Sequence, residues 1–153
     1  MVARFILALG GETQGAMVVE TAFVAPVLAL LGLGAVDASM MISRQSELQQ
    51  AVAEAAQIAI AATPDTQVEH DAIAGVIRTS TGLTGARAAQ VSVGVRYRCG
   101  TATTLVSSNT CDSTSAVSTY LDIAVSDSYS PLWRSFGIGA PIAITVSRQI
   151  VIS

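Results

Sequence analysis

The sequence predicts an α+β protein: a long N-terminal transmembrane and stalk helix, a second shorter helix, and a small antiparallel β-sheet of about three strands. Three observations predict it. Residues 16–36 carry a single charge, apolar residues then recur at helical spacing as far as Pro64, and three segments of the second half alternate between apolar and polar residues. We take these elements in chain order.

The first helix is predicted from its apolar length. Residues 16–36 carry no charge except that of Glu20, and as an α-helix they span about 31 Å, close to the hydrocarbon thickness of a bilayer. The pattern then continues as a stripe at steps of three and four residues, formed by Leu48, Val52, Ala55, Ala59 and Ala62. We therefore expect one helix over residues 16–63, with a membrane-spanning part over 16–43 and an amphipathic continuation over 44–63.

The flanking segments complete the predicted organisation. Residues 1–15 are interpreted as a leader peptide, and residues 64–153 as an α+β head outside the cytoplasm. A helix is expected over residues 66–78, with Val68, Ile73, Val76 and Ile77 near one face, followed by a loop over residues 79–85. Alternation predicts strands over residues 91–98, 121–126 and 142–147. Pro131, Trp133 and Phe136 lie between the last two strands and are expected under the sheet or at its rim.

Cysteine content and charge narrow the function classes. Cys99 and Cys111 flank a polar, turn-rich segment, which predicts a disulfide if the domain lies in an oxidising compartment; the alternative is two free thiols in a cytosolic protein. The eight arginines are scattered, there is no lysine, and the net charge is −3, so nucleic acid is not an expected partner. With one histidine and two cysteines, no metal site or cofactor is predicted.

Glu20 is the most informative residue. A carboxylate costs about 2.5–3.5 kcal/mol at the centre of a membrane, and the apolar run holds no lysine or arginine to pair with it. Cleavage after Gly15 would give Ala16 a free ammonium group about one helical turn away, available to Glu20 of the same or a neighbouring subunit.

A stripe of small residues also marks the apolar run, at Ala22, Ala25, Ala29, Gly32 and Ser39. Small residues let membrane helices approach closely, as a filament of packed helices requires. The alternative is that an alanine-rich segment produces such a stripe by chance.

These residues resemble a known family. Gly15, Glu20 as the fifth residue after the proposed cut, and the apolar run resemble type IV pilin precursors. Residues 18–28 and 44–51 are similar to the TadE-like pseudopilins of the tight-adherence (Flp) pilus, and residues 129–132 and 143–148 are similar to that family's closing strands. Thr21 stands where the smallest members often have tyrosine, which favours a minor subunit.

The resemblance implies a non-enzymatic subunit of pilus assembly. Prepilin peptidase would cleave after Gly15, and the chain would cross the bacterial inner membrane once, with a cytoplasmic N-terminus and a periplasmic C-terminal domain. Other pilin or pseudopilin subunits and the assembly machinery would be its partners, and no cofactor or small-molecule substrate is implied.

Other interpretations remain open. The chain could be a single-span envelope protein whose outer domain binds a cell-wall or protein partner, or a secreted enzyme cleaved near residues 34–39. His70 and Asp71 could suggest hydrolysis, but adjacent helix positions point in different directions. Asp122 and Asp127 could bind calcium, but no loop of regularly spaced oxygen ligands accompanies them.

Overall fold

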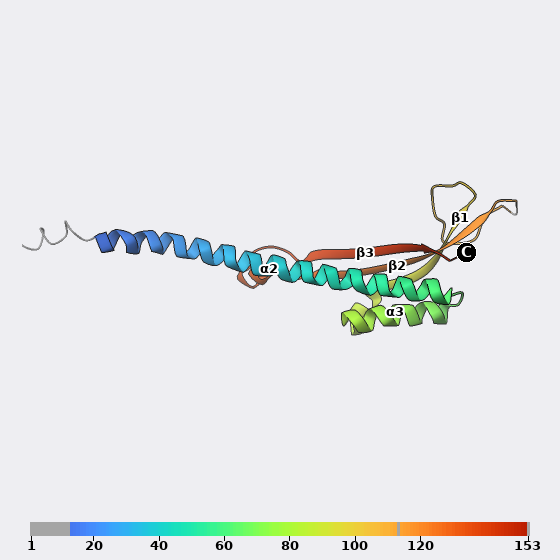
Figure 1. Ribbon diagram of the computed structural model, residues 1–153, viewed down its shortest axis with the longest axis horizontal. Coiled ribbons are helices and arrows are strands. Elements are labelled where there is room, and N and C mark those ends of the chain that lie inside the picture. Colours follow the sequence, from blue (N-terminus) through green and yellow to red (C-terminus); the bar gives the residue numbers. More distant parts are fainter. Residues whose placement is uncertain (1–12, 113, 153) are drawn as a thin grey trace, which may run out of the picture. The chain divides into compact units, whose positions relative to one another are not determined.

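The computed structural model describes residues 13–112 and 114–152, without the side chains of residues 13–17, 88, 89 and 136. Most of the predicted leader lies outside the described residues. Among these residues, two α-helices and a three-stranded antiparallel sheet confirm the α+β prediction (Figure 1). The chain divides into two compact units, one ending at Met40 and one beginning at Met41, which are described separately. The elements are α2 (Thr13–Ala62), α3 (Gln67–Thr81), η1 (Gly85–Gln90), β1 (Val91–Cys99), β2 (Val117–Tyr129), η2 (Leu132–Phe136) and β3 (Ile142–Val151).

Helix α2 is a single helix of 50 residues, which agrees with the predicted continuous helix. Pro26 lies inside it without ending it. Proline removes one backbone hydrogen bond, which a long helix tolerates when its remaining bonds hold. By length and composition the helix is able to cross a membrane.

Helix α3 starts and ends at specific caps. The Thr66 hydroxyl accepts a hydrogen bond from the Glu69 N–H, and the Glu69 carboxylate accepts one from the Thr66 N–H, which forms a capping box. The hydrogen bonds from the Thr66 N–H, the Thr66 hydroxyl and the Asp65 N–H lower the pKa of Glu69. At the other end Gly82 adopts the left-handed conformation, with φ of 65°. The helix therefore continues to Thr81, three residues beyond the predicted end.

The buried face of α3 differs in part from the prediction. Ile73 and Ile77 are buried as expected, but Val68 is 78% exposed. Val68 occupies the first turn, whose orientation is set by the capping box, and His70 provides the first buried side chain instead. The prediction was wrong for Val68 because periodicity alone does not show where a short helix first meets the core.

The sheet has the order β1-β2-β3, with β2 in the centre. In its register Ile123 lies opposite Val93 on one side and Arg148 on the other. Leu121, Ile123 and Val125 are fully buried against the helices, as alternation predicted. Strand β2 is longer at both ends than predicted, because pairing with its two neighbours extends beyond the apolar residues.

One core joins the helices to one face of the sheet. The stripe on α2 is formed by Leu48, Ala51, Val52, Ala55, Ala56 and Ala59, and it packs with α3 and the strands. In Figure 1, α3 lies alongside the C-terminal part of α2. The predicted stripe holds except at Ala62, which is exposed because α2 ends there and the chain turns at Thr63 and Pro64.

The segment between β2 and β3 holds the residues expected under the sheet or at its rim. Pro131 is buried and Trp133, in η2, is half-buried. The side chain of Phe136 lies outside the described residues.

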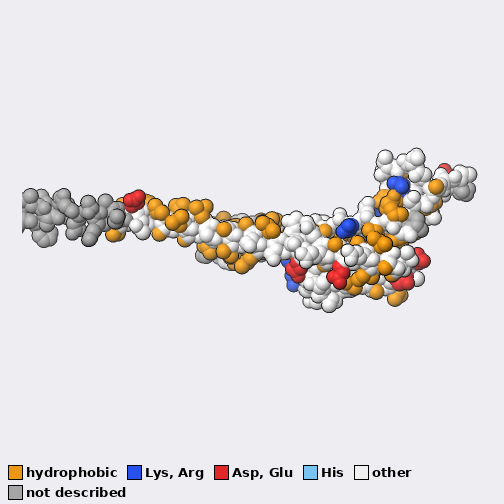
Figure 2. All heavy atoms as spheres, in the orientation of Figure 1, with side chains coloured by type: hydrophobic (Ala, Val, Ile, Leu, Met, Phe, Trp, Pro, Cys, Tyr) orange, Lys and Arg blue, Asp and Glu red, His pale blue; other side chains and the backbone are white. Residues whose placement is uncertain are grey.

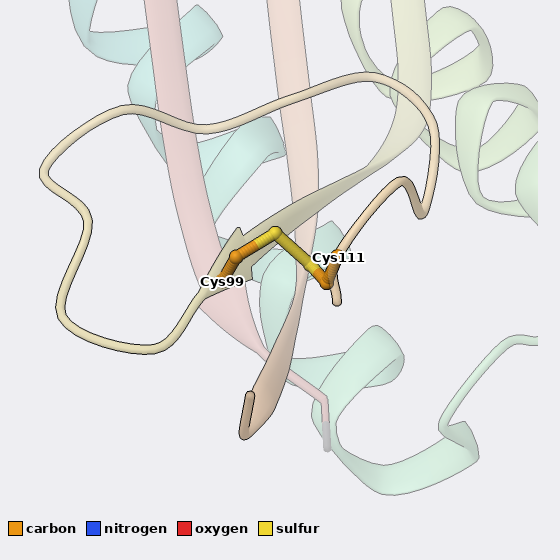
Figure 3. The surroundings of a disulfide bond; sticks show 2 residues. All are labelled: Cys99 and Cys111. Carbon is orange, nitrogen blue, oxygen red and sulfur yellow. A yellow bond between two sulfur atoms is a disulfide. The ribbon is translucent and has the colours of Figure 1, made fainter. Parts of the chain in front are cut away.

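The predicted disulfide is confirmed. Cys99, the last residue of β1, is bonded to Cys111 in the loop before β2, with their Cα atoms 5.3 Å apart (Figure 3). The same loop pairs with β1 at one point, where the N–H groups of Tyr97 and Val106 each donate to the other's carbonyl at 2.8 and 2.9 Å. The loop is thus anchored to the end of the sheet by a covalent bond and a β-bridge.

Replacing both Cys99 and Cys111 with serine is expected to lower the free energy of unfolding by about 3 kcal/mol. The disulfide restricts the unfolded chain by closing a short loop, and its removal gives that conformational entropy back to the unfolded state. Urea unfolding of the full chain in detergent, followed by the fluorescence of Trp133, the chain's single tryptophan, measures this. A reductant should shift the wild-type midpoint downwards and leave the double variant unchanged. An unchanged wild-type midpoint would contradict the prediction.

Candidate functional site

The surface of α2 before Met41 is apolar and open. Val19, Phe23 and Leu31 are 59%, 75% and 65% exposed, and they are typical of the segment. Figure 2 shows hydrophobic side chains along this part of the chain. Soluble monomers rarely expose so long an apolar surface, so this surface fits a lipid or helix environment.

The predicted assembly residues all map to this segment. Glu20 is exposed on it, and no lysine or arginine lies between Arg4 and Arg44 in the sequence. Gly15 and Ala16, the predicted cleavage junction, lie in the first turn of α2, and their side chains are outside the described residues.

The predicted small-residue stripe is also exposed. At its start a shallow hollow is lined by Val18, Thr21, Ala22 and Ala25. Ala29 lies one helical turn beyond Ala25. A Cβ atom at Gly32 would meet nothing within 4 Å, so the described part of the chain does not itself require a glycine there.

A second cluster, in the unit that begins at Met41, is centred on Arg44. The Arg44 Nε–H donates to Asp127 Oδ2 at 2.8 Å, and one terminal nitrogen lies 2.6 Å from the same oxygen. The other terminal nitrogen donates to Glu47 at 2.8 Å and to the carbonyl of Thr81, the last residue of α3, at 2.9 Å. One guanidinium group therefore joins α2, the end of α3 and β2.

The electrostatics of this cluster favour its charged form. Partial burial by itself would lower the pKa of Arg44, but the hydrogen bonds and negative charges of Glu47 and Asp127 outweigh it and raise that pKa. The Asp127 side chain is 4% exposed, and its other oxygen accepts the Ser128 N–H at 2.9 Å. Asp127 is therefore a buried carboxylate paired with arginine, a different role from the calcium ligand considered above.

The sequence contains a signal for this cluster. Asp127 continues the series of every second residue formed by Leu121, Ile123 and Val125 on the buried face of β2. An acidic residue on a buried face requires a partner. That partner is Arg44, which follows the predicted membrane-spanning part.

Residues 15–57 match the family model described as TadE-like protein. Residues 15–57 are a TadE-like segment. No curated protein and no solved structure matches the chain. Over these residues the match agrees with the resemblance described above, and it supports involvement in the Tad (Flp) pilus system.

The TadE-like segment covers a defined part of the fold. It begins at the predicted cleavage junction, includes the exposed apolar surface and Glu20, and ends within the buried stripe of α2. It also includes Arg44 and Glu47, whereas Asp127 and the sheet lie beyond it. Within the unit that begins at Met41, Arg44 therefore connects the TadE-like segment to α3 and β2.

The remaining polar candidates outside the TadE-like segment do not form a site. His70 is buried, with Nε2 placed 3.3 Å from the Pro64 carbonyl, whereas Asp71 is exposed and accepts a hydrogen bond from Gln67. Asp122 lies 3.9 Å from Arg96. Within residues 13–112 and 114–152 no three histidine, cysteine or acidic side chains group as metal ligands would.

Proposed function

We propose that this chain is a membrane-anchored minor pilin or pseudopilin that takes part in the assembly of a tight-adherence (Flp-type) pilus. The observation that carries the proposal is the exposed apolar surface of α2, interrupted by Glu20 and lying inside the TadE-like segment. The proposed role is structural, as it is for TadE-like pilus proteins.

The proposed topology places residues 16–43 in the bacterial inner membrane, residues 1–15 in the cytoplasm, and residues from 44 onwards in the periplasm. The Cys99–Cys111 disulfide supports an oxidising compartment for the head. The apolar composition of the segment after Ala16 supports insertion of the helix.

Maturation is proposed to proceed by cleavage of the Gly15–Ala16 peptide bond by prepilin peptidase. The new ammonium group on Ala16 would then neutralise Glu20 of an adjoining subunit. In a low-dielectric environment such a pair is favourable only when both charges are present and close together. Cleavage would thereby convert an isolated carboxylate into an assembly contact.

The helix packing that follows would use the small residues Ala22, Ala25, Ala29 and Gly32. Their side chains leave the helix surface shallow, which lets a second helix approach its backbone. The open space around Gly32 supports this interpretation, because a larger residue there would be accommodated in a helix without partners.

Replacing Gly15 with alanine is expected to block maturation. The peptidase must bind the backbone directly before the scissile bond, and the added methyl group would obstruct that binding. The precursor should accumulate in the membrane fraction, keep residues 1–15 and form no pili. Intact mass spectrometry of that fraction distinguishes precursor from product.

A Gly11→Ala variant is the matched control, since it adds the same methyl group within the leader but away from the junction. It should be processed like the wild type. Normal processing of the Gly15→Ala variant would contradict the proposed cleavage site.

A further inference from the structure

The two edges of the sheet are unequal. The outer edge of β1 is bonded at Tyr97 by Val106 of the chain's own loop. Along the outer edge of β3, by contrast, none of the described residues adds a strand. The head therefore covers part of one edge and leaves the other available for pairing.

The hydrogen-bonding groups on the open edge follow from the register. The Ile152 N–H donates to the Thr119 carbonyl at 2.9 Å, which makes this a hydrogen-bonded pair of the antiparallel ladder. Because such pairs alternate along a strand, every second residue of β3 turns its N–H and C=O outwards. These outward residues, all exposed, are Ala143, Thr145, Ser147, Gln149 and Val151.

The usual protection of an edge strand is missing from β3. Proteins block edges with proline, bulges, charged side chains or a covering segment. Strand β3 contains no proline, pairs with β2 without a bulge, and carries no charge on its five outward residues. Its one charged residue, Arg148, points to the helix side of the sheet, between Val146 and Ile150.

Arg148 borders an open groove of about 540 Å³ between β3 and α2. The groove is lined on the helix side by Ser46, Gln49 and Gln50, whose side chains carry hydrogen-bond donors and acceptors. Arg148 is exposed, and none of the ion pairs within the described part of the chain includes its guanidinium group. The groove thus presents an uncompensated positive charge directly beside an open strand edge.

We propose that the outer edge of β3 is a docking site for an extended segment of another protein, which adds as a fourth strand. The segment would carry a carboxylate on the helix side, to pair with Arg148, among apolar residues that continue the row of Ile144 and Ile150. Its other face would carry small polar residues that continue the row of Thr145 and Ser147. Main-chain hydrogen bonds would supply the affinity, and the carboxylate the specificity.

A second copy of the chain fits this edge less well. Two β3 strands pairing antiparallel about Ser147 would put Val146 opposite Arg148, and would leave the two Arg148 side chains diagonal neighbours, roughly 7–8 Å apart.

The other edge of a second copy, β1, offers Val91, Val93 and Val95 on the helix side, with no carboxylate, and is already bonded at Tyr97. Charge complementarity therefore favours an acidic segment from a different protein. This inference concerns the head and does not depend on cleavage after Gly15.

The test uses the full chain in detergent micelles and two synthetic nonapeptides. The first is Val-Ser-Val-Ser-Glu-Thr-Val-Ser-Val, and the second has glutamine in place of glutamate. The glutamate peptide is expected to bind about ten-fold more tightly, as one charge-assisted hydrogen bond provides. Amide hydrogen exchange should slow at Ser147 and Gln149, whose N–H groups point outwards.

Three variants of β3 separate main-chain pairing from other modes of binding. Ser147→Pro removes an outward N–H without touching the β2–β3 ladder, and should abolish binding. Ser147→Ala keeps that N–H and should bind like the wild type. Arg148→Gln should keep binding but lose the preference for the glutamate peptide. Exchange protection at Val146 and Arg148, whose N–H groups face β2, verifies that each variant keeps its ladder.

Three results would overturn the proposal. One is the absence of binding of either peptide to the wild type. Another is equal binding of the glutamate peptide by Ser147→Pro and Ser147→Ala. The third is protection of the outward amides that rises with protein concentration in the absence of peptide, since it would identify a second copy as the occupant.

Discussion

Replacing Arg44 with methionine is expected to lower the free energy of unfolding of the head by about 3–5 kcal/mol. Among the described residues, the change leaves the buried Asp127 carboxylate with only the Ser128 N–H as a hydrogen-bond donor, and it removes the donor to the carbonyl at the end of α3. A buried charge without its partner is among the few single changes that cost this much. Urea unfolding of the full chain in detergent, monitored by Trp133 fluorescence, reports on the head alone.

Two further variants test the reason for this loss. Arg148→Met removes an exposed arginine with no ion pair among the described residues, and should change stability by no more than about 0.5 kcal/mol. Combining Arg44→Met with Asp127→Leu should recover most of the loss, because the buried charge is gone. If the Arg44→Met variant proved as stable as the wild type, the cluster around Arg44 would not hold the head together.

Replacing Glu20 with glutamine is expected to leave insertion and cleavage intact but to reduce incorporation into pili by about ten-fold or more. The amide keeps the size of the side chain but cannot form the proposed ion pair with a neighbouring Ala16 ammonium group, and a charge-assisted hydrogen bond contributes about 1.5–3 kcal/mol. The amount of the subunit in sheared pili, relative to the membrane fraction, measures the effect.

The matched control for this prediction is Glu54→Gln, which makes the same change on an exposed position of α2 outside the apolar segment. It should assemble normally. If Glu20→Gln also assembles normally, the membrane helix acts only as an anchor, and a single-span envelope protein that binds a cell-wall or protein partner through its head becomes the better account.

The parts of the fold that depend on local patterns could be predicted from the sequence. The apolar run and the stripe from Leu48 to Ala59 predict α2, and strict alternation predicts the cores of the three strands. The cysteine pair also follows from its spacing and polar loop. Each of these signals lies within one segment of the chain.

Features that depend on tertiary contact could not be predicted in the same way. Arg44 and Asp127 are 83 residues apart, and periodicity gives no information on which arginine meets the buried acid. Likewise, the open edge depends on β2 being the central strand and on Val106 reaching Tyr97, neither of which alternation shows. The prediction for Val68 was wrong for a related reason, since the cap of α3, and not the composition of the helix, sets the orientation of its first turn.

The identity of the mature N-terminus tests the central claim most directly. Intact mass spectrometry of the wild-type subunit, isolated from membranes of piliated cells, should give a chain lighter by the mass of residues 1–15 and beginning at Ala16. Recovery of a subunit that keeps Met1 while pili are assembled normally would contradict the account, because Glu20 would then have no new ammonium group to pair with.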